Sequence, residues 1–133
     1  MNGKAHILGE RAAALANYPH MREAGGLLWV SGISARRPDG SVEGLGDIRA
    51  QTRAVIENVR AVLGAAGADL GHLVDLTAYL VDMADYAGYN EVYDTYFRAT
   101  TGPARTTVAV RELPGPDLLI EIKGVALAPG RPT

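Results

Sequence analysis

Two charged side chains near the C-terminal end of the sequence lie in segments whose other residues predict strands. Glu121 interrupts the apolar run Leu118-Leu119-Ile120-Glu121-Ile122, and Arg105 lies near the start of the strand before it. Burying a carboxylate costs several kcal/mol unless the group is paired or hydrogen-bonded. Neighbouring antiparallel strands could bring the two side chains together. A purely structural ion pair explains the same pattern, and the residue types alone favour that interpretation.

The same two residue types can also do chemistry on a substrate. A guanidinium such as that of Arg105 binds a carboxylate through two parallel hydrogen bonds. A carboxyl such as that of Glu121, placed among apolar residues, is expected to have a raised pKa and can take a proton from water and pass it on. Together they are candidates for binding a carboxylate and for transferring a proton beside it.

The elements that must position these residues follow from the hydrophobic pattern. Apolar residues recur at helical spacing from Ile48 to Ala66, with Asp47 at the N-cap position and Gly67 just beyond the end. Alternation of apolar and polar residues predicts a strand from Leu73 to Val81. The other predicted strands cover residues 20–23 and 27–31, which form a hairpin, and residues 104–110 and 118–127.

A second helix is predicted from Tyr86 to Phe97, with Asp85 as its N-cap. Its aromatic residues repeat at helical spacing and form a stripe. Such a stripe is more typical of a core or a contact between subunits than of a ligand site. Its members are Tyr86, Tyr89, Tyr93, Tyr96 and Phe97.

The predicted order of elements is ββαβαββ, which describes a single α+β domain over residues 1–133. Residues 1–17 are rich in alanine and are expected to form a loosely held N-terminal arm. Both helices should cover one face of a mostly antiparallel mixed sheet. The other face also needs cover, and for so small a domain another copy of the chain is the simplest source.

Composition excludes several classes of function. The chain has 133 residues with 13 Lys and Arg against 15 Asp and Glu, a net charge of -2 that argues against a nucleic-acid partner. It has no cysteine, and its histidines are too scattered for a metal motif, so neither a metal nor another cofactor is expected. No apolar run approaches the roughly 20 residues that span a membrane, and no signal peptide is recognisable. We therefore expect a cytoplasmic protein with no membrane partner.

Four short phrases of the sequence are typical of one known family: Ser31-Gly32, Gly88-Tyr89-Asn90, Gly102-Pro103-Ala104-Arg105 and Ile120-Glu121-Ile122. On these phrases the chain resembles the RidA (YjgF) family over residues 18 to 128. Members of that family have a chorismate-mutase-like α+β fold and form homotrimers around a barrel core, with a ligand cleft at each subunit interface. They typically hydrolyse imines and enamines to ketones and ammonia without a cofactor.

Five longer segments are more similar to the 2-aminomuconate deaminases of that family than to its housekeeping branch. They are residues 34–39, 47–52, 88–93, 105–110 and 118–123. Thr107 and Ile33 stand where many housekeeping members carry cysteine and glutamine. The resemblance implies conversion of 2-aminomuconate to 2-hydroxymuconate or 4-oxalocrotonate plus ammonia, in the catabolism of aromatic compounds. In this reaction Arg105 would bind the carboxylate beside the C=N bond, and Glu121 would activate water and protonate the leaving amine.

The resemblance also implies a set of substrate-binding residues, each with a plainer structural explanation. Tyr18 would line the cleft or anchor the N-terminal arm, and Asn90 and Thr107 would bond the substrate or serve as ordinary helix and strand residues. The second substrate carboxylate would need its own partner. The full set of binding candidates is Tyr18, Ser31, Gly32, Asn90, Thr107 and His20, with Arg36, Arg37 and His20 as candidates for the second carboxylate.

Two other functions fit the same residues. The first is a general deaminase of reactive imines and enamines such as 2-iminobutanoate and 2-iminopropanoate. The second is a trimeric module that binds small carboxylates without turnover. Arg105 serves either function equally, whereas Glu121 favours an enzyme because a carboxylate binder has no use for a second negative charge beside its anion.

Overall fold

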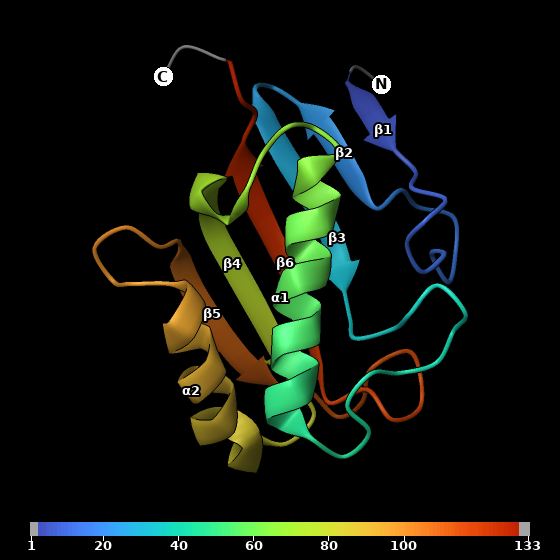
Figure 1. Ribbon diagram of the computed structural model, residues 1–133, viewed down its shortest axis with the longest axis vertical. Coiled ribbons are helices and arrows are strands. Elements are labelled where there is room, and N and C mark those ends of the chain that lie inside the picture. The colour runs from blue at the N-terminus through green and yellow to red at the C-terminus, as the bar shows by residue number, and fades with distance from the viewer. Residues whose placement is uncertain (1–2, 131–133) are drawn as a thin grey trace.

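The computed structural model describes residues 3–130, which form one six-stranded sheet and two α-helices (Figure 1). The short 3₁₀ turns η1 and η2 precede β4 and α2. In chain order the elements are β1 (Lys4–His6), β2 (Met21–Ala24), β3 (Leu27–Ile33), α1 (Ile48–Gly64), η1 (Leu70–His72), β4 (Leu73–Leu80), η2 (Met83–Asp85), α2 (Tyr86–Tyr96), β5 (Ala104–Ala109) and β6 (Ile120–Leu127).

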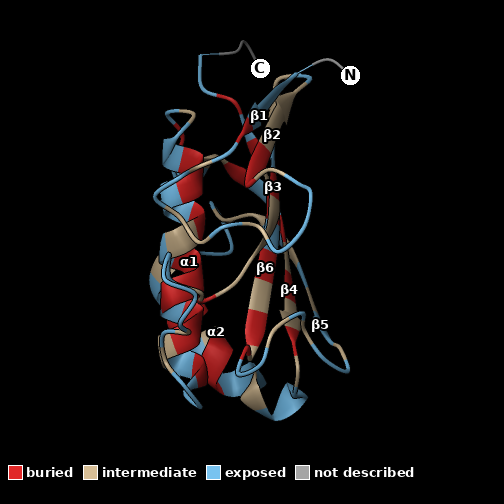
Figure 2. Cartoon of the chain, turned by 90° about the vertical axis from the view of Figure 1, so that its right-hand side faces the viewer, coloured by how far each residue is buried: buried red, intermediate tan, exposed pale blue. Residues whose placement is uncertain are grey.

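The strands lie in the order β1-β2-β3-β6-β4-β5, and every neighbouring pair is antiparallel except β4 and β5. The parallel pair follows from its connection, because α2 carries the chain from β4 back to the start of β5. Both helices lie against the same face of the sheet (Figure 2). The predicted α+β architecture, with a mixed sheet covered on one face, is confirmed.

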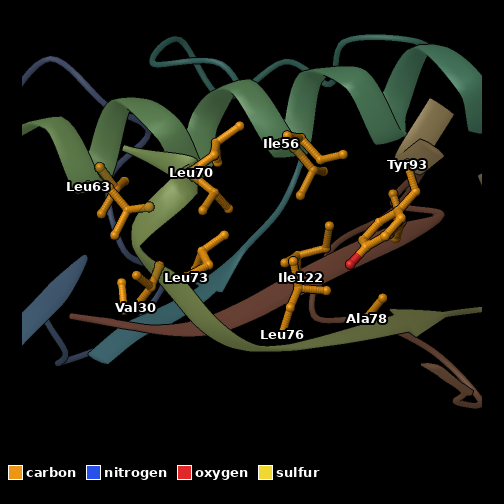
Figure 3. Packing of buried hydrophobic residues seen from close by; sticks show 14 of the residues in the cluster. Val30, Ile56, Leu63, Leu70, Leu73, Leu76, Ala78, Tyr93 and Ile122 are labelled. Atoms are coloured by element: carbon orange, nitrogen blue, oxygen red, sulfur yellow. The ribbon is translucent and has the colours of Figure 1, made fainter. Parts of the chain in front are cut away.

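The core lies between the helices and the covered face of the sheet (Figure 3). This core includes Ile56 and Leu63 of α1, Leu76 of β4 and Ile122 of β6, and each of these side chains is at most 1 % exposed. Burial of such a side chain contributes about 1.5–3 kcal/mol. Because strand side chains alternate between faces, the buried Ile122 fixes which face its neighbour Glu121 must take.

Gln51 ties the start of α1 to the segment before β6. Its side chain is fully buried and donates to the backbone oxygens of Gly44 and Asp117, at 3.2 and 2.8 Å. Its Oε1 accepts from the backbone N–H of Leu119 at 2.9 Å. These three bonds hold the entry to β6, and thereby the position of Glu121, relative to the helix.

Two aspartates were predicted to cap helix N-termini, and the structure confirms one of them. Asp47 caps α1, since its side chain accepts from the N–H of Ala50 as predicted. Asp85 stands at the start of α2 but forms no capping bond. The chain is already helical there, because η2 precedes α2, and Asp82 accepts from the N–H of Ala84 instead. The predicted capping role of Asp85 is therefore wrong.

The N-terminal segment contains a strand that the sequence pattern did not predict. Lys4–His6 pairs with β2 as an edge strand, and the His6 ring lies 3.2 Å from a carboxylate oxygen of Glu23. Part of the expected arm is therefore in the sheet, while Met1 and Asn2 lie outside the described residues. No helix among residues 3–130 is long and apolar enough to cross a membrane.

Candidate functional site

Arg105 lies on the edge strand β5, beneath α2, and is held by side chains of that helix. Its Nη1 donates to Oδ1 of Asn90 at 2.8 Å, and its Nη2 donates to the hydroxyl of Tyr86 at 3.0 Å. Its Cζ lies 4.6 Å from the ring centroid of Tyr93 and 5.0 Å from that of Tyr89. The ring faces attract the cation, and the two bonds leave most of the five guanidinium N–H groups available for a carboxylate.

Thr107 lies two residues further along β5, on the same face as Arg105. Its Oγ1 is 3.1 Å from the hydroxyl of Tyr89, whose side chain is fully buried. Burial raises the pKa of Tyr89, and that of Tyr93, so both hydroxyls stay protonated at neutral pH. We call Arg105, Asn90, Thr107 and the three tyrosines 86, 89 and 93 the Arg105 cluster.

Glu121 lies on β6 between two fully buried isoleucines, and its carboxylate faces away from the helices. Half-burial raises the pKa of this carboxyl through desolvation. Within residues 3–130 it forms neither a hydrogen bond nor an ion pair. It packs against Gly32, because a Cβ added to Gly32 would lie 2.7 Å from its Cδ and still closer to its Oε2. A half-buried, unpaired carboxyl with a raised pKa is suited to proton transfer.

The expectation that Arg105 and Glu121 lie on neighbouring strands is wrong. β4 lies between β5 and β6. Arg105 pairs with Leu76, whose side chain points to the helices, whereas Glu121 pairs with Tyr79 and points to the opposite face. Two strand spacings separate the two backbones by about 10 Å across the sheet. Within one chain these groups cannot act on the same small molecule.

Four of the six predicted binding residues, and the two arginines predicted for a second carboxylate, line a cleft of about 400 Å³ beside α1. Tyr18, His20, Ser31 and Gly32 form part of its wall. The rest is formed by residues 11–14, by residues 33–38, by Glu43 and by Arg53, Ala54, Glu57, Asn58 and Val62 of α1. We call this space the N-terminal cleft. Ser31 donates its hydroxyl proton to the backbone oxygen of Pro19 at 2.7 Å, which fastens the segment before β2 to β3. Gly32 connects the cleft with Glu121, since it lines the one and contacts the other.

His20 also lines this cleft, but both of its ring nitrogens are occupied. Nδ1 accepts from the backbone N–H of Leu8 at 3.1 Å, and Nε2 lies 2.7 Å from the backbone oxygen of Ala12, which can only accept. When both bonds are made, Nδ1 accepts from Leu8 and Nε2 donates to Ala12. His20 fixes the segment from Leu8 to Ala12 as a wall of the cleft and has no free donor for a substrate.

The predicted site residues thus form two groups that do not meet in one chain. Arg105, Asn90 and Thr107 form one group, and Glu121 with Gly32 and the cleft forms the other. The sequence did not indicate that Tyr86, Tyr89 and Tyr93 hold Arg105. The available signal was their spacing, because Tyr86 and Asn90 are one helical turn apart and share the face of Tyr89 and Tyr93. In the part of the chain that the structure describes, no cluster of three or more His, Asp or Glu side chains could hold a metal ion.

Comparison with known proteins supports the relationship indicated by these residues. Residues 9–128 match the family model described as Endoribonuclease L-PSP. The chain belongs to this family, which includes the RidA, YjgF and RutC proteins.

Two curated relatives and one solved structure illustrate the range of this family. The RutC family protein PH0854 from Pyrococcus horikoshii is 43% identical over 109 residues, 82% of this chain and 85% of the relative. The 3-aminoacrylate deaminase RutC from Acinetobacter baylyi is 40% identical over 112 residues, 84% of this chain and 87% of the relative. The structure of Escherichia coli TdcF with bound serine aligns with a TM-score of 0.82 at 30% identity, covering 93% of this chain and 98% of TdcF.

Proposed function

We propose that this protein is a deaminase that hydrolyses reactive imines and enamines of small amino acids to 2-oxo acids and ammonia. The observation that carries this proposal is the Arg105 cluster, which holds a guanidinium in place with most of its donors free. RutC is named as a deaminase of 3-aminoacrylate, an enamine that carries a carboxylate. Its 40% identity to this chain supports the same class of reaction here.

The active site would form between two copies of the chain. Arg105 lies on the edge strand, and Glu121 lies on the uncovered face of the sheet, so a neighbouring copy can bring the first group to the second. The uncovered face is apolar enough to bind a neighbour, because Trp29, Val108 and Leu127 are 44%, 38% and 37% exposed there. A closed ring such as a homotrimer would repeat this contact without leaving a free face.

The chemistry needs only these two side chains and a water molecule. Arg105 of one copy binds the substrate carboxylate and thereby orients the adjacent C=NH₂⁺ group. Glu121 of the next copy takes a proton from water as its oxygen bonds to that carbon. It then gives this proton to the nitrogen and removes the hydroxyl proton as the C–N bond breaks. That last proton passes from Glu121 to the departing ammonia, which regenerates the carboxylate. Iminium and water thus become a ketone and ammonium, and proton transfer of this kind contributes about 10²- to 10⁴-fold in rate.

The first test is turnover of imines generated in solution by an amino acid oxidase. Wild-type protein is expected to speed ammonia release from 2-iminobutanoate, whereas Arg105→Ala and Glu121→Ala should not. Circular dichroism and size-exclusion chromatography check that both variants keep the fold and assembly. If wild-type protein and Glu121→Ala bind 2-oxobutanoate, Arg105→Ala does not, and none of the three accelerates release, the protein is a module that binds small carboxylates without turnover.

A narrower candidate within the same class is 2-aminomuconate, which carries a carboxylate at each end. The observation that favours it is the set of arginines lining the N-terminal cleft next to Gly32. Direct comparison of 2-aminomuconate with 2-iminobutanoate separates the narrow substrate from the general one. A kcat/KM at least tenfold higher for 2-aminomuconate would support the narrow assignment, and an equal or lower value would reject it.

A further inference from the structure

The geometry points to the N-terminal cleft as an anion subsite that binds the distal carboxylate of a small dicarboxylic substrate. This inference rests on the proposed function, because it assigns the cleft to the far end of the molecule whose near end is hydrolysed beside Glu121. It names a substrate class, the imines and enamines of dicarboxylic amino acids, and it gives the arginines of the cleft a role in selecting that class.

The charge of the cleft is opposite to that of the protein. Four arginines line it, against two glutamates, while the whole chain carries a net charge of -2. Both glutamates already have partners, since Glu43 lies 3.6 Å from Nε of Arg37 and Glu57 lies 3.5 Å from Nη1 of Arg60. Glu57 also accepts a hydrogen bond from the hydroxyl of Tyr96 at 2.8 Å. The lining therefore retains an excess of positive charge, which favours an anionic ligand.

Two of these arginines do not bind another side chain or backbone group in the described part of the subunit. Within residues 3–130 the side chains of Arg11 and Arg53 form no hydrogen bond and no ion pair, although both line the cleft. A third, Arg36, uses Nη2 to donate to the backbone oxygen of Ala13 at 3.1 Å, which leaves its other N–H groups unused. Several guanidinium forks facing one cleft suit a planar carboxylate better than a single surface charge would.

The cleft has the size and the position that a short dicarboxylate requires. Its volume of about 400 Å³ falls within the usual range for small-ligand sites. Ala54 and Val62 supply apolar lining on the α1 side, which suits a short carbon chain between two charged ends. Gly32 lines this cleft and also contacts the Glu121 carboxylate, so the cleft reaches to within one residue of that group.

The test is calorimetric binding of two product-like acids to the full-length protein. We expect 2-oxoglutarate, with two carboxylates, to bind at least tenfold more tightly than 2-oxobutanoate, with one. Arg53→Gln and Arg11→Gln should each weaken 2-oxoglutarate by about tenfold, the effect of losing one charge-assisted hydrogen bond, and should leave 2-oxobutanoate unchanged. Arg49→Gln is the matched control, because Arg49 lies one turn from Arg53 on α1, pairs with Glu91 and does not line the cleft.

The alternative outcomes show whether the anion subsite or the proposed function is wrong. Equal affinity for the two acids, or equal weakening of both by Arg53→Gln, overturns the anion subsite, and turnover of 2-iminobutanoate in the same preparation leaves the proposed function standing. Selective binding of 2-oxoglutarate without turnover of either 2-iminoglutarate or 2-iminobutanoate overturns the proposed function and leaves the subsite standing. An effect of Arg49→Gln as large as that of Arg53→Gln also overturns the subsite, since a general loss of charge would then explain it.

Discussion

Arg105 and Glu121 project from opposite faces of one sheet, with β4 between their strands. A guanidinium placed to bind a carboxylate and a carboxyl placed to transfer a proton therefore belong to separate surfaces of the subunit. Each group is held in place within its own subunit. Side chains of α2 hold Arg105, and the buried isoleucines on either side of Glu121 hold its position in β6. We propose that they form two half-sites, which a second copy of the chain brings together.

The support of Arg105 can be tested through Asn90. Asn90→Ala removes the 2.8 Å bond to Nη1 and frees the guanidinium to turn. We expect KM for a carboxylate-bearing imine to rise by about tenfold, because one hydrogen bond to a charged group is lost. Tyr86→Phe removes one hydroxyl but keeps the ring, and its effect should be smaller. Steady-state kinetics check both, and an unchanged KM in Asn90→Ala would contradict the positioning role.

The contact between Gly32 and Glu121 can be tested by adding a single methyl group. Gly32→Ala would place a Cβ 2.7 Å from Cδ of Glu121 and so displace the carboxylate. Because the displaced group is a flexible side chain, kcat should fall by about tenfold or more while the fold survives. Gly64→Ala is the control, since nothing lies within 4 Å of its added Cβ. That variant should keep its kcat and gain at most about 1 kcal/mol of stability.

The pH dependence of kcat follows from the raised pKa of Glu121. The carboxyl must be ionised to accept a proton from water, and burial raises its pKa above the ordinary value of 4.5. In the substrate complex the bound carboxylate offsets the charge of Arg105, so burial should dominate. We therefore expect kcat to fall as the pH is lowered through a value above 4.5. A kcat that stays constant down to pH 4.5 would show that Glu121 is not the base.

His20 offers a test that separates structure from substrate binding. His20→Ala removes both ring bonds, to Leu8 and Ala12, and should lower the free energy of unfolding by about 1–3 kcal/mol. Urea unfolding measures this loss, and limited proteolysis should show faster cleavage within residues 8–18. A variant with unchanged stability but a raised KM would instead restore the role that the sequence suggested for His20.

The sequence predicted those helices and strands that a strong local pattern marks. The apolar repeat and Asp47 predicted α1 to within two residues of its observed end, and alternation identified β4. The order of strands was harder, because it depends on which strand β5 joins. Because β5 and β6 follow one another in the chain, they were expected to be neighbours in the sheet. Instead, the crossover through α2 places β5 on one side of β4, and β6 lies on the other side of β4.

The candidate site was predictable as a set of residues but not as an arrangement. Residue type indicated Arg105 and Glu121, since one can bind a carboxylate and the other is a charge among apolar residues. The faces to which they point depend on registers that pair Arg105 with Leu76 and Glu121 with Tyr79. No local pattern in either strand reveals these pairings. The same limit hid the role of His20, whose partners lie in a segment with a weak pattern.

The most direct test of the shared active site mixes two inactive variants. Arg105→Ala and Glu121→Ala are unfolded together in equal amounts, refolded, and assayed for imine hydrolysis beside refolded wild-type protein. If every site takes one group from each of two copies, random assembly should restore about a quarter of the wild-type activity. Recovery of no activity, in a mixture that reassembles as fully as the wild type, would contradict the account.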